Sequence, residues 1–179
     1  MPEFLEKLSN GEKAILGGSL IVLVSMFLPW YGWDFNFGNS ILGSINSSGS
    51  VDGFNSWGWL TFIGFLFVVI LWLVRGPLSD QVELPDIPLK DAQLFMIGGG
   101  VEVLGALLFW LAYKASNASG PGYSAGVRFG VFIAIVGGAA TIAGGYLRQS
   151  EPEALASTPN APAPPPASYG APPPATPPV

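Results

Sequence analysis

The chain has 179 residues, of which 50% are hydrophobic and only 11% are charged, a composition typical of a protein that crosses a membrane several times. It contains no cysteine and no histidine, which excludes disulfides and thiolate metal sites and removes the commonest metal ligand and general base. The net charge of −5, without a basic stripe, argues against nucleic acid as a partner.

Residues 10–30 form the first predicted helix. Ser9 and Glu12 have the spacing of a capping box, which indicates that the helix begins just after Ser9. Pro29 and Trp30 end it with a helix breaker and an aromatic residue typical of the membrane interface. The Gly-, Ser- and Asn-rich loop of residues 32–56 follows, and a small hairpin is an alternative there because residues 33–37 alternate with a period of two.

Three further apolar segments predict helices at about residues 57–74, 92–113 and 127–147. A helix of the length of residues 92–113 reaches about 33 Å, and a hydrocarbon core is roughly 30 Å thick. We therefore predict an all-α fold in which residues 1–148 form a four-transmembrane-helix bundle embedded in membrane lipid.

Small residues recur every seven positions on the last two predicted helices. They are Gly98, Gly105 and Ala112 on the third helix and Gly130, Gly137 and Gly144 on the fourth. Such residues let helix backbones approach closely in lipid, so we expect helix-packing faces, either within the chain or, as the alternative, in a homo-oligomer. The opposite face of the third helix is expected to meet lipid through Phe95, Leu104, Leu107, Leu108 and Leu111.

Glu102 shares the small face of the third helix, near mid-membrane. A carboxylate at that depth costs about 2.5 kcal/mol or more and normally turns into the bundle. One interpretation is a neutral acid hydrogen-bonded across the bundle, which would fix helix register. The other is a proton- or cation-binding site with hydroxyl partners drawn from Ser19, Ser25, Thr61 and Thr141; the candidate polar site is Glu102 with Thr141 and Ser25.

From residue 149 the composition changes abruptly, and eleven of the seventeen prolines lie in residues 149–179. This segment is predicted to be a disordered tail that acts as a spacer or recruits a protein partner. The basic residues indicate the orientation. Five of them, Lys7, Lys13, Arg75, Lys90 and Arg148, fall on one predicted side, against Lys114 and Arg128 on the other. This distribution predicts that both termini are cytoplasmic.

The segments LSNGEK, FLPWYGW and GGYLR, with the Gly/Ser/Asn-rich loop between the first two helices, resemble a recurring type of small bacterial four-helix membrane protein, whose members often carry proline-rich tails. The resemblance covers residues 1–148. It implies a multipass location in the bacterial inner membrane and carries over no functional residue.

No nucleophile–base pair, phosphate loop, dinucleotide fingerprint or calcium-binding loop can be recognised. We therefore expect no catalytic, cofactor-binding or metal-binding residues and no enzymatic activity. The expected function is that of a non-enzymatic scaffold or accessory protein, with an outer loop and a cytoplasmic tail that recruits partners. The alternative is an oligomeric protein that handles protons or cations through Glu102.

Overall fold

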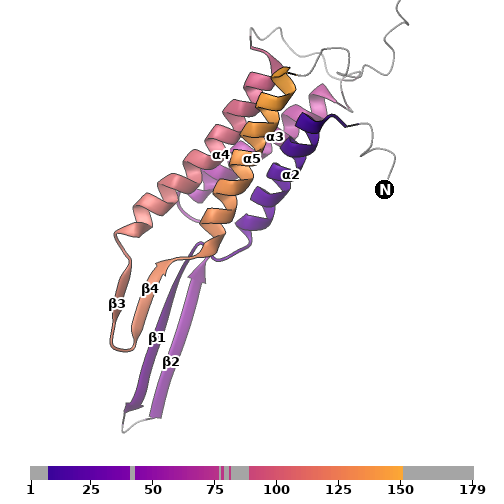
Figure 1. The fold of residues 1–179 in the computed structure, drawn as a ribbon. Helices are drawn as coiled ribbons and strands as arrows, with labels where there is room; N and C mark the ends of the chain where they lie inside the picture. Colours follow the sequence, from indigo (N-terminus) through magenta and orange to yellow (C-terminus); the bar gives the residue numbers. More distant parts are fainter. Residues whose placement is uncertain (1–7, 41–42, 77, 79–80, 82–88, 151–179) are drawn as a thin grey trace, which may run out of the picture.

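The structure is a computed structural model that describes residues 8–40, 43–76, 78, 81 and 89–150. Within these residues four helices form a bundle, and four strands form an antiparallel sheet at one end of it (Figure 1). The helices are α2 (Asn10–Met26), α3 (Gly58–Arg75), α4 (Asp91–Lys114) and α5 (Phe129–Ser150); the strands are β1 (Tyr31–Ser40), β2 (Gly43–Val51), β3 (Ala118–Gly120) and β4 (Tyr123–Val127). The four predicted helices are confirmed, whereas the all-α fold class is wrong because both loops at this end form strands.

Helix α2 starts at the predicted capping box. The Ser9 hydroxyl accepts a hydrogen bond from the Glu12 amide at 3.2 Å, and the Glu12 carboxylate accepts one from the Ser9 amide at 3.0 Å. The helix ends at Met26, earlier than the predicted residue 30, because the chain turns toward the sheet before β1 and Trp30 donates its amide to the Val51 carbonyl at 2.8 Å.

The sheet has the strand order β2-β1-β4-β3. The central pair joins distant parts of the chain, with Tyr31 opposite Val127 and Phe35 opposite Tyr123. The hairpin alternative for residues 33–37 is confirmed, since β1 pairs with β2 over nearly its whole length. Because side chains alternate along a strand, β1 presents aromatic residues (Tyr31, Trp33, Phe35) on one face and small or polar residues (Gly32, Asp34, Asn36) on the other.

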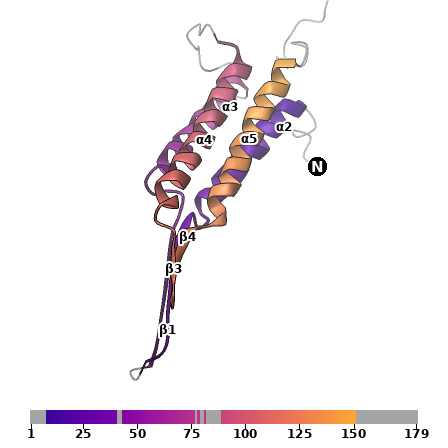
Figure 2. The ribbon, with the colours of Figure 1, turned by 60° about the vertical axis from the view of Figure 1, so that its left-hand side comes forward.

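In the bundle, α2 packs on α5, α5 on α4, and α4 on α3, while α2 also touches α3. The sheet continues from the bundle as a thin blade, seen nearly edge-on in Figure 2. Trp30 is completely buried at the junction. Its indole N–H donates to the Ser25 carbonyl at 2.7 Å, and its ring meets Phe109 edge-on with centroids 5.0 Å apart.

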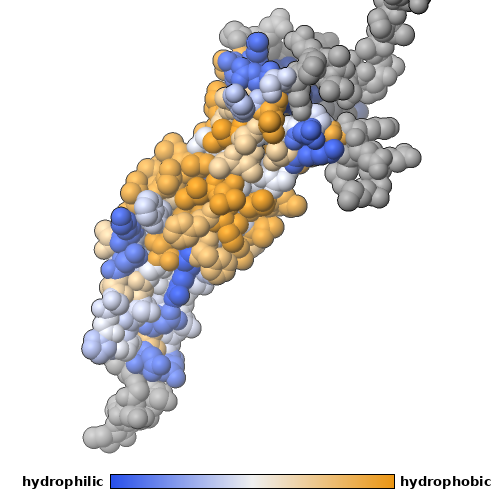
Figure 3. Space-filling view, in the orientation of Figure 1, coloured by the Kyte–Doolittle hydropathy of each residue, from blue (hydrophilic) through white to orange (hydrophobic). Residues whose placement is uncertain are grey.

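Helices α3, α4 and α5 are long and apolar enough to cross a membrane, by length and composition. Figure 3 shows a continuous hydrophobic band over the helical part, with polar surface on the sheet and at the opposite end. The exposed residues of this band include Leu20, Val24, Ile63, Ile70, Ile97, Leu104, Leu111, Phe132 and Val136. The helices thus expose large apolar side chains and bury many small ones, the arrangement expected of a bundle surrounded by lipid.

The predicted proline-rich tail lies outside the described residues from residue 151 onward, as does Lys7 at the other end. Gln149 and Ser150, assigned above to the tail, are instead the last residues of α5.

Candidate functional site

Glu102 lies in the middle of α4, between α3 and α5, and is completely buried. Gly64 of α3 packs against its backbone, where an added Cβ atom would stand 2.8 Å from the Glu102 nitrogen. Gly138 of α5 packs against its side chain, where a Cβ atom would stand 3.2 Å from the Glu102 Cβ. Glycines on two neighbouring helices therefore let the bundle close around this acid, and its side chain has no access to lipid.

Helix α2 brings a second polar group to the same depth. A Cβ atom on Gly18 would lie 2.7 Å from the Thr141 hydroxyl oxygen, and Thr141 in turn lies beside the Glu102 carboxyl group. Ser19 follows Gly18 and is 3% exposed. Ser19, Thr141 and Glu102 thus belong to one level of the bundle, contributed by α2, α5 and α4.

The carboxyl group of Glu102 lies within reach of the Thr141 hydroxyl but makes no hydrogen bond of standard geometry with a described residue. Neither Glu102 oxygen is bonded to any of the described residues, and the Ser19 hydroxyl is likewise unpaired there. The Thr141 hydroxyl is directed elsewhere, to the Gly137 carbonyl at 3.2 Å. A buried polar group without a partner costs free energy comparable to a lost hydrogen bond, so such a group in a native interior calls for an explanation.

The two remaining expected hydroxyl partners also bond to backbone. Ser25 donates to the Val22 carbonyl at 2.6 Å. It lies in the last turn of α2, near the sheet, and not at the level of the Glu102 carboxyl group. Thr61 donates to the backbone carbonyl of Glu102 at 3.0 Å and so ties α3 to α4. The expected site of Glu102, Thr141 and Ser25 is therefore only partly assembled: Thr141 lies beside the acid and Ser25 does not.

Chemically, this level of the bundle offers one carboxyl group and one unpaired hydroxyl. Among the buried residues of the described segments, Glu102 is the only acidic or basic one, so no basic side chain compensates a negative charge there. Such a carboxyl group can hold a proton, or it can accept a small cation or a water molecule. Thr141 of α5 is the hydroxyl placed to form the cross-bundle hydrogen bond that would fix helix register, although its contact with Glu102 does not have standard hydrogen-bond geometry.

Four of the five predicted packing glycines lie at helix–helix contacts, and Gly130 packs against the segment that follows α2. Gly98 and Gly105 face α3, Gly137 and Gly144 face α2, and Gly130 packs against Trp30 and the Pro29 carbonyl. The repeat on α4 ends before Ala112, which is exposed. Phe95 was expected to meet lipid but is completely buried. The reason is that α4 contacts both α3 and α5, so its buried arc is wider than a single seven-residue stripe.

A second set of glycine contacts, between α4 and α5, was not predicted from the sequence. Gly99 of α4 packs against the Gly138 carbonyl of α5, and Gly145 of α5 packs against the Ala92 carbonyl of α4. The feature of the sequence that indicates these contacts is the pair of Gly-Gly doublets at residues 137–138 and 144–145. In each doublet one glycine contacts α2 and its neighbour contacts α4.

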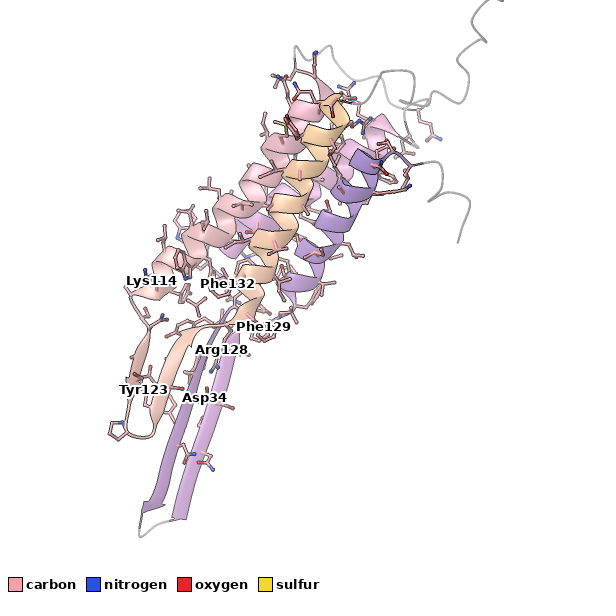
Figure 4. All side chains as sticks on the ribbon, viewed as in Figure 1. Asp34, Lys114, Tyr123, Arg128, Phe129 and Phe132 are labelled. Carbon is pink, nitrogen blue, oxygen red and sulfur yellow. The ribbon has the colours of Figure 1, made fainter. Side chains whose placement is uncertain are left out.

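The junction between sheet and bundle holds a charged pair that was not predicted as a site. Arg128 immediately precedes α5, and its guanidinium group forms a salt bridge with the Asp34 carboxylate on β1. Figure 4 shows Asp34 on the strand below Arg128, and Phe129 and Phe132 above it on the first turn of α5. The pair borders an open groove of about 440 Å³.

Comparison with known proteins gives no family assignment, because no protein-family model and no curated protein matches the sequence. Within the described residues, no cluster of three or more acidic, histidine or cysteine side chains is placed to hold a metal ion. Glu102 and the junction of sheet and bundle are the two candidate functional features of the described residues.

Proposed function

We propose that this chain is a multipass protein of the bacterial inner membrane that crosses the bilayer four times. In this proposal it holds its sheet on the outer side as a non-enzymatic binding platform, and residues 149–179 form a cytoplasmic tail that recruits partners. The protein would thus act as a scaffold or accessory protein. The single observation that carries the proposal is the direct hydrogen-bonded connection between sheet and bundle.

That connection consists of short backbone contacts. The Arg128 amide donates to the Trp30 carbonyl at 2.8 Å, and the Gly53 amide donates to the Met26 carbonyl at 3.0 Å. Strand β1 is therefore joined to α2 by the four residues 27–30, which include the buried Trp30, and β4 is joined to α5 by Arg128 alone. A sheet held this way is preorganised for binding, which lowers the entropy lost when a partner docks.

A fourth span through α2 is supported by its outer surface. The helix has 17 residues, the lower end of the range that spans a bilayer. Leu20, Val24 and Phe27 at its surface are 60%, 51% and 70% exposed. Large apolar side chains exposed at the surface of a helix that buries several glycine and serine residues are expected where lipid surrounds the helix.

The orientation is supported by the charges at the two ends of the bundle. Lys13, Arg75, Lys90 and Arg148 lie at the end without the sheet, while Lys114 and Arg128 lie at the sheet end. The cytoplasmic side of a membrane protein carries the excess of lysine and arginine, which favours a sheet on the outer side.

Orientation can be tested directly because the chain contains no cysteine. Single cysteines are introduced as Ser48→Cys on β2 and Ser150→Cys at the end of α5. A membrane-impermeant maleimide added to intact spheroplasts should label the first variant at once and the second only after permeabilisation. The reverse pattern would overturn the orientation, and labelling of both without permeabilisation would overturn the four-span topology.

The platform is tested by photo-crosslinking in native membranes. A photoreactive amino acid at Ser48, which is exposed on the sheet, should yield a discrete protein adduct, while the same probe at the lipid-facing Leu66 should not. The experiment is repeated with residues 151–179 deleted to separate the contributions of sheet and tail. Absence of an adduct from Ser48 in both chains would overturn the platform.

Proton or cation handling is a second candidate function, favoured by the unpaired carboxyl group of Glu102. Its test is flux into liposomes that contain the purified chain and a pH-sensitive or cation-sensitive dye. Under this function Glu102→Gln abolishes flux, and deletion of residues 151–179 leaves it unchanged. No flux under any imposed gradient would eliminate this candidate without affecting the platform proposal.

A further inference from the structure

The groove beside the Asp34–Arg128 pair lies where the polar face of the sheet meets the start of α5. It measures about 440 Å³, and its lining includes Pro29, Gly32, Asp34, Ser50, Arg128 and Phe129. A second hollow of about 240 Å³ continues from it along β1 and β2 and shares Asp34 and Ser48 with it. The lining thus places one positive and one negative side chain together with serine hydroxyls.

Both charged groups keep capacity for a ligand. The Arg128 and Asp34 side chains are 41% and 52% exposed, and the salt bridge joins one guanidinium nitrogen to one carboxylate oxygen. A guanidinium group has five N–H donors, and a carboxylate has two acceptor oxygens. A ligand that carries an anionic and a cationic group can therefore bind both residues while their own contact persists.

One rim of the groove is apolar. Phe129, which lines the groove, and Phe132 on the first turns of α5 are 54% and 51% exposed. Figure 4 shows that Phe129 and Phe132 lead from Arg128 onto the helical part of the molecule, where the hydrophobic band of Figure 3 begins. A molecule bound here meets charges on one side and apolar surface on the other.

We propose that this groove binds the headgroup of a phospholipid that carries both a phosphate and a primary ammonium group. The phosphate contacts Arg128, the ammonium contacts Asp34, and an acyl chain lies along Phe129 and Phe132. This inference rests on the proposed function, because the groove meets lipid only if the bundle spans the bilayer.

The pair of charges decides between lipid classes. Asp34 neutralises Arg128, so an anionic lipid without an ammonium group gains little from the site. A choline headgroup carries its positive charge without any N–H donor, whereas a primary ammonium group forms charge-assisted hydrogen bonds with a carboxylate. The site therefore favours phosphatidylethanolamine over phosphatidylglycerol and phosphatidylcholine.

The test uses the full chain in mild detergent, incubated with equal amounts of the three lipids and analysed by native mass spectrometry. We expect phosphatidylethanolamine to be retained preferentially. Because each variant removes one charge-assisted contact, Arg128→Gln and Asp34→Asn should each weaken its retention about tenfold. The control is Lys114→Gln, which alters the other basic residue of this end, a residue that lies over the Trp110 ring, and it should leave retention unchanged.

A further variant covers the case in which loss of the ion pair disturbs the fold. Ser50 is exposed and lines the groove, so Ser50→Leu fills the groove while both charges remain. It should abolish the preference without lowering the unfolding temperature. Equal retention of phosphatidylcholine, preferential retention of phosphatidylglycerol, or no effect of Ser50→Leu would each overturn the proposal.

Competition with soluble phosphoethanolamine tests whether the groove binds a whole lipid or only a free headgroup. It lacks acyl chains, so it should compete only weakly, and competition as strong as that of the lipid would overturn the role of Phe129 and Phe132. The cysteine-labelling experiment separates this inference from the proposed function. A chain that is labelled as expected but shows no lipid preference refutes the headgroup site alone.

Discussion

Gly18 of α2 and Gly137 of α5 contact each other reciprocally. A Cβ atom on Gly18 would lie 2.6 Å from the Gly137 carbonyl oxygen, and one on Gly137 would lie 2.9 Å from the Gly18 carbonyl oxygen. Neither position can hold a side chain unless the two helix backbones separate. The neighbouring Gly17 is exposed, and a Cβ atom there would meet nothing within 4 Å.

This pair of neighbours gives a matched test. We expect Gly18→Ala to lower the free energy of unfolding by about 1–3 kcal/mol, the usual cost of overpacking. Gly17→Ala should leave it unchanged or raise it by up to about 1 kcal/mol, because alanine favours a helix over glycine. Thermal unfolding in detergent, followed by circular dichroism, measures both. Equal destabilisation by the two variants would show that α2 and α5 do not pack through Gly18.

Replacing Glu102 by methionine tests whether its carboxyl group has a partner. Methionine keeps an unbranched, flexible side chain of similar length, and it removes two buried oxygens that make no hydrogen bond of standard geometry. We expect Glu102→Met to raise the unfolding temperature, since an unsatisfied buried polar group costs about 1–3 kcal/mol.

Thr61→Val is the comparison for that experiment. It removes a hydroxyl that does bond across helices, to the Glu102 carbonyl, and should cost about 0.6 kcal/mol, a typical value for such bonds in membrane helices. If Glu102→Met were the more destabilising of the two, the carboxyl group would have to be hydrogen-bonded across the bundle.

Trp30 is expected to anchor the junction of sheet and bundle. Trp30→Phe removes the indole donor of the buried Ser25 carbonyl, which keeps the Leu28 amide at 3.1 Å, and should lower the free energy of unfolding by about 0.5–1.5 kcal/mol. Trp59→Phe is the control, because Trp59 is 52% exposed, and it should change stability by less than about 0.5 kcal/mol. Chemical denaturation of both variants in the same detergent decides the point; similar midpoints would contradict the anchoring role.

Two contributions to stability at the start of α2 can be measured separately: the helix cap formed by Ser9 and the ion pair formed by Glu12. Ser9→Ala removes the capping hydroxyl and should cost about 1 kcal/mol. Glu12→Gln retains an acceptor for the Ser9 amide and loses only the charge in the pair with Arg148, at 3.5 Å. Its effect should stay below about 1 kcal/mol, as for other partly exposed ion pairs. A larger loss for Glu12→Gln than for Ser9→Ala in thermal melts would assign the stability to the ion pair.

The helices could be predicted because their signals are local. The capping box of Ser9 and Glu12 and the run of apolar residues around Glu102 each lie within one segment, and both survive in the structure. The spacing of Gly137 and Gly144 likewise indicated a packing face from one helix alone. It did not indicate which helix would be the partner, because the heptad pattern is the same for any neighbour.

The sheet and the two candidate sites depend on contacts between distant residues. Tyr31 pairs with Val127, which is distant from it in the sequence. The strand segments are also rich in glycine, serine and asparagine, which carry little intrinsic preference for strands. The salt bridge of Asp34 and Arg128 exists only because β1 and α5 meet there.

Composition and periodicity therefore determined by themselves that the chain forms lipid-compatible helices with one acid placed among small residues. Only the tertiary structure decided which hydroxyl lies beside this acid and that the two loops pair with each other in one sheet. The physical reason is that helix formation and hydrophobicity act between near neighbours in sequence, whereas strand pairing and polar contacts depend on which segments the packed helices bring together.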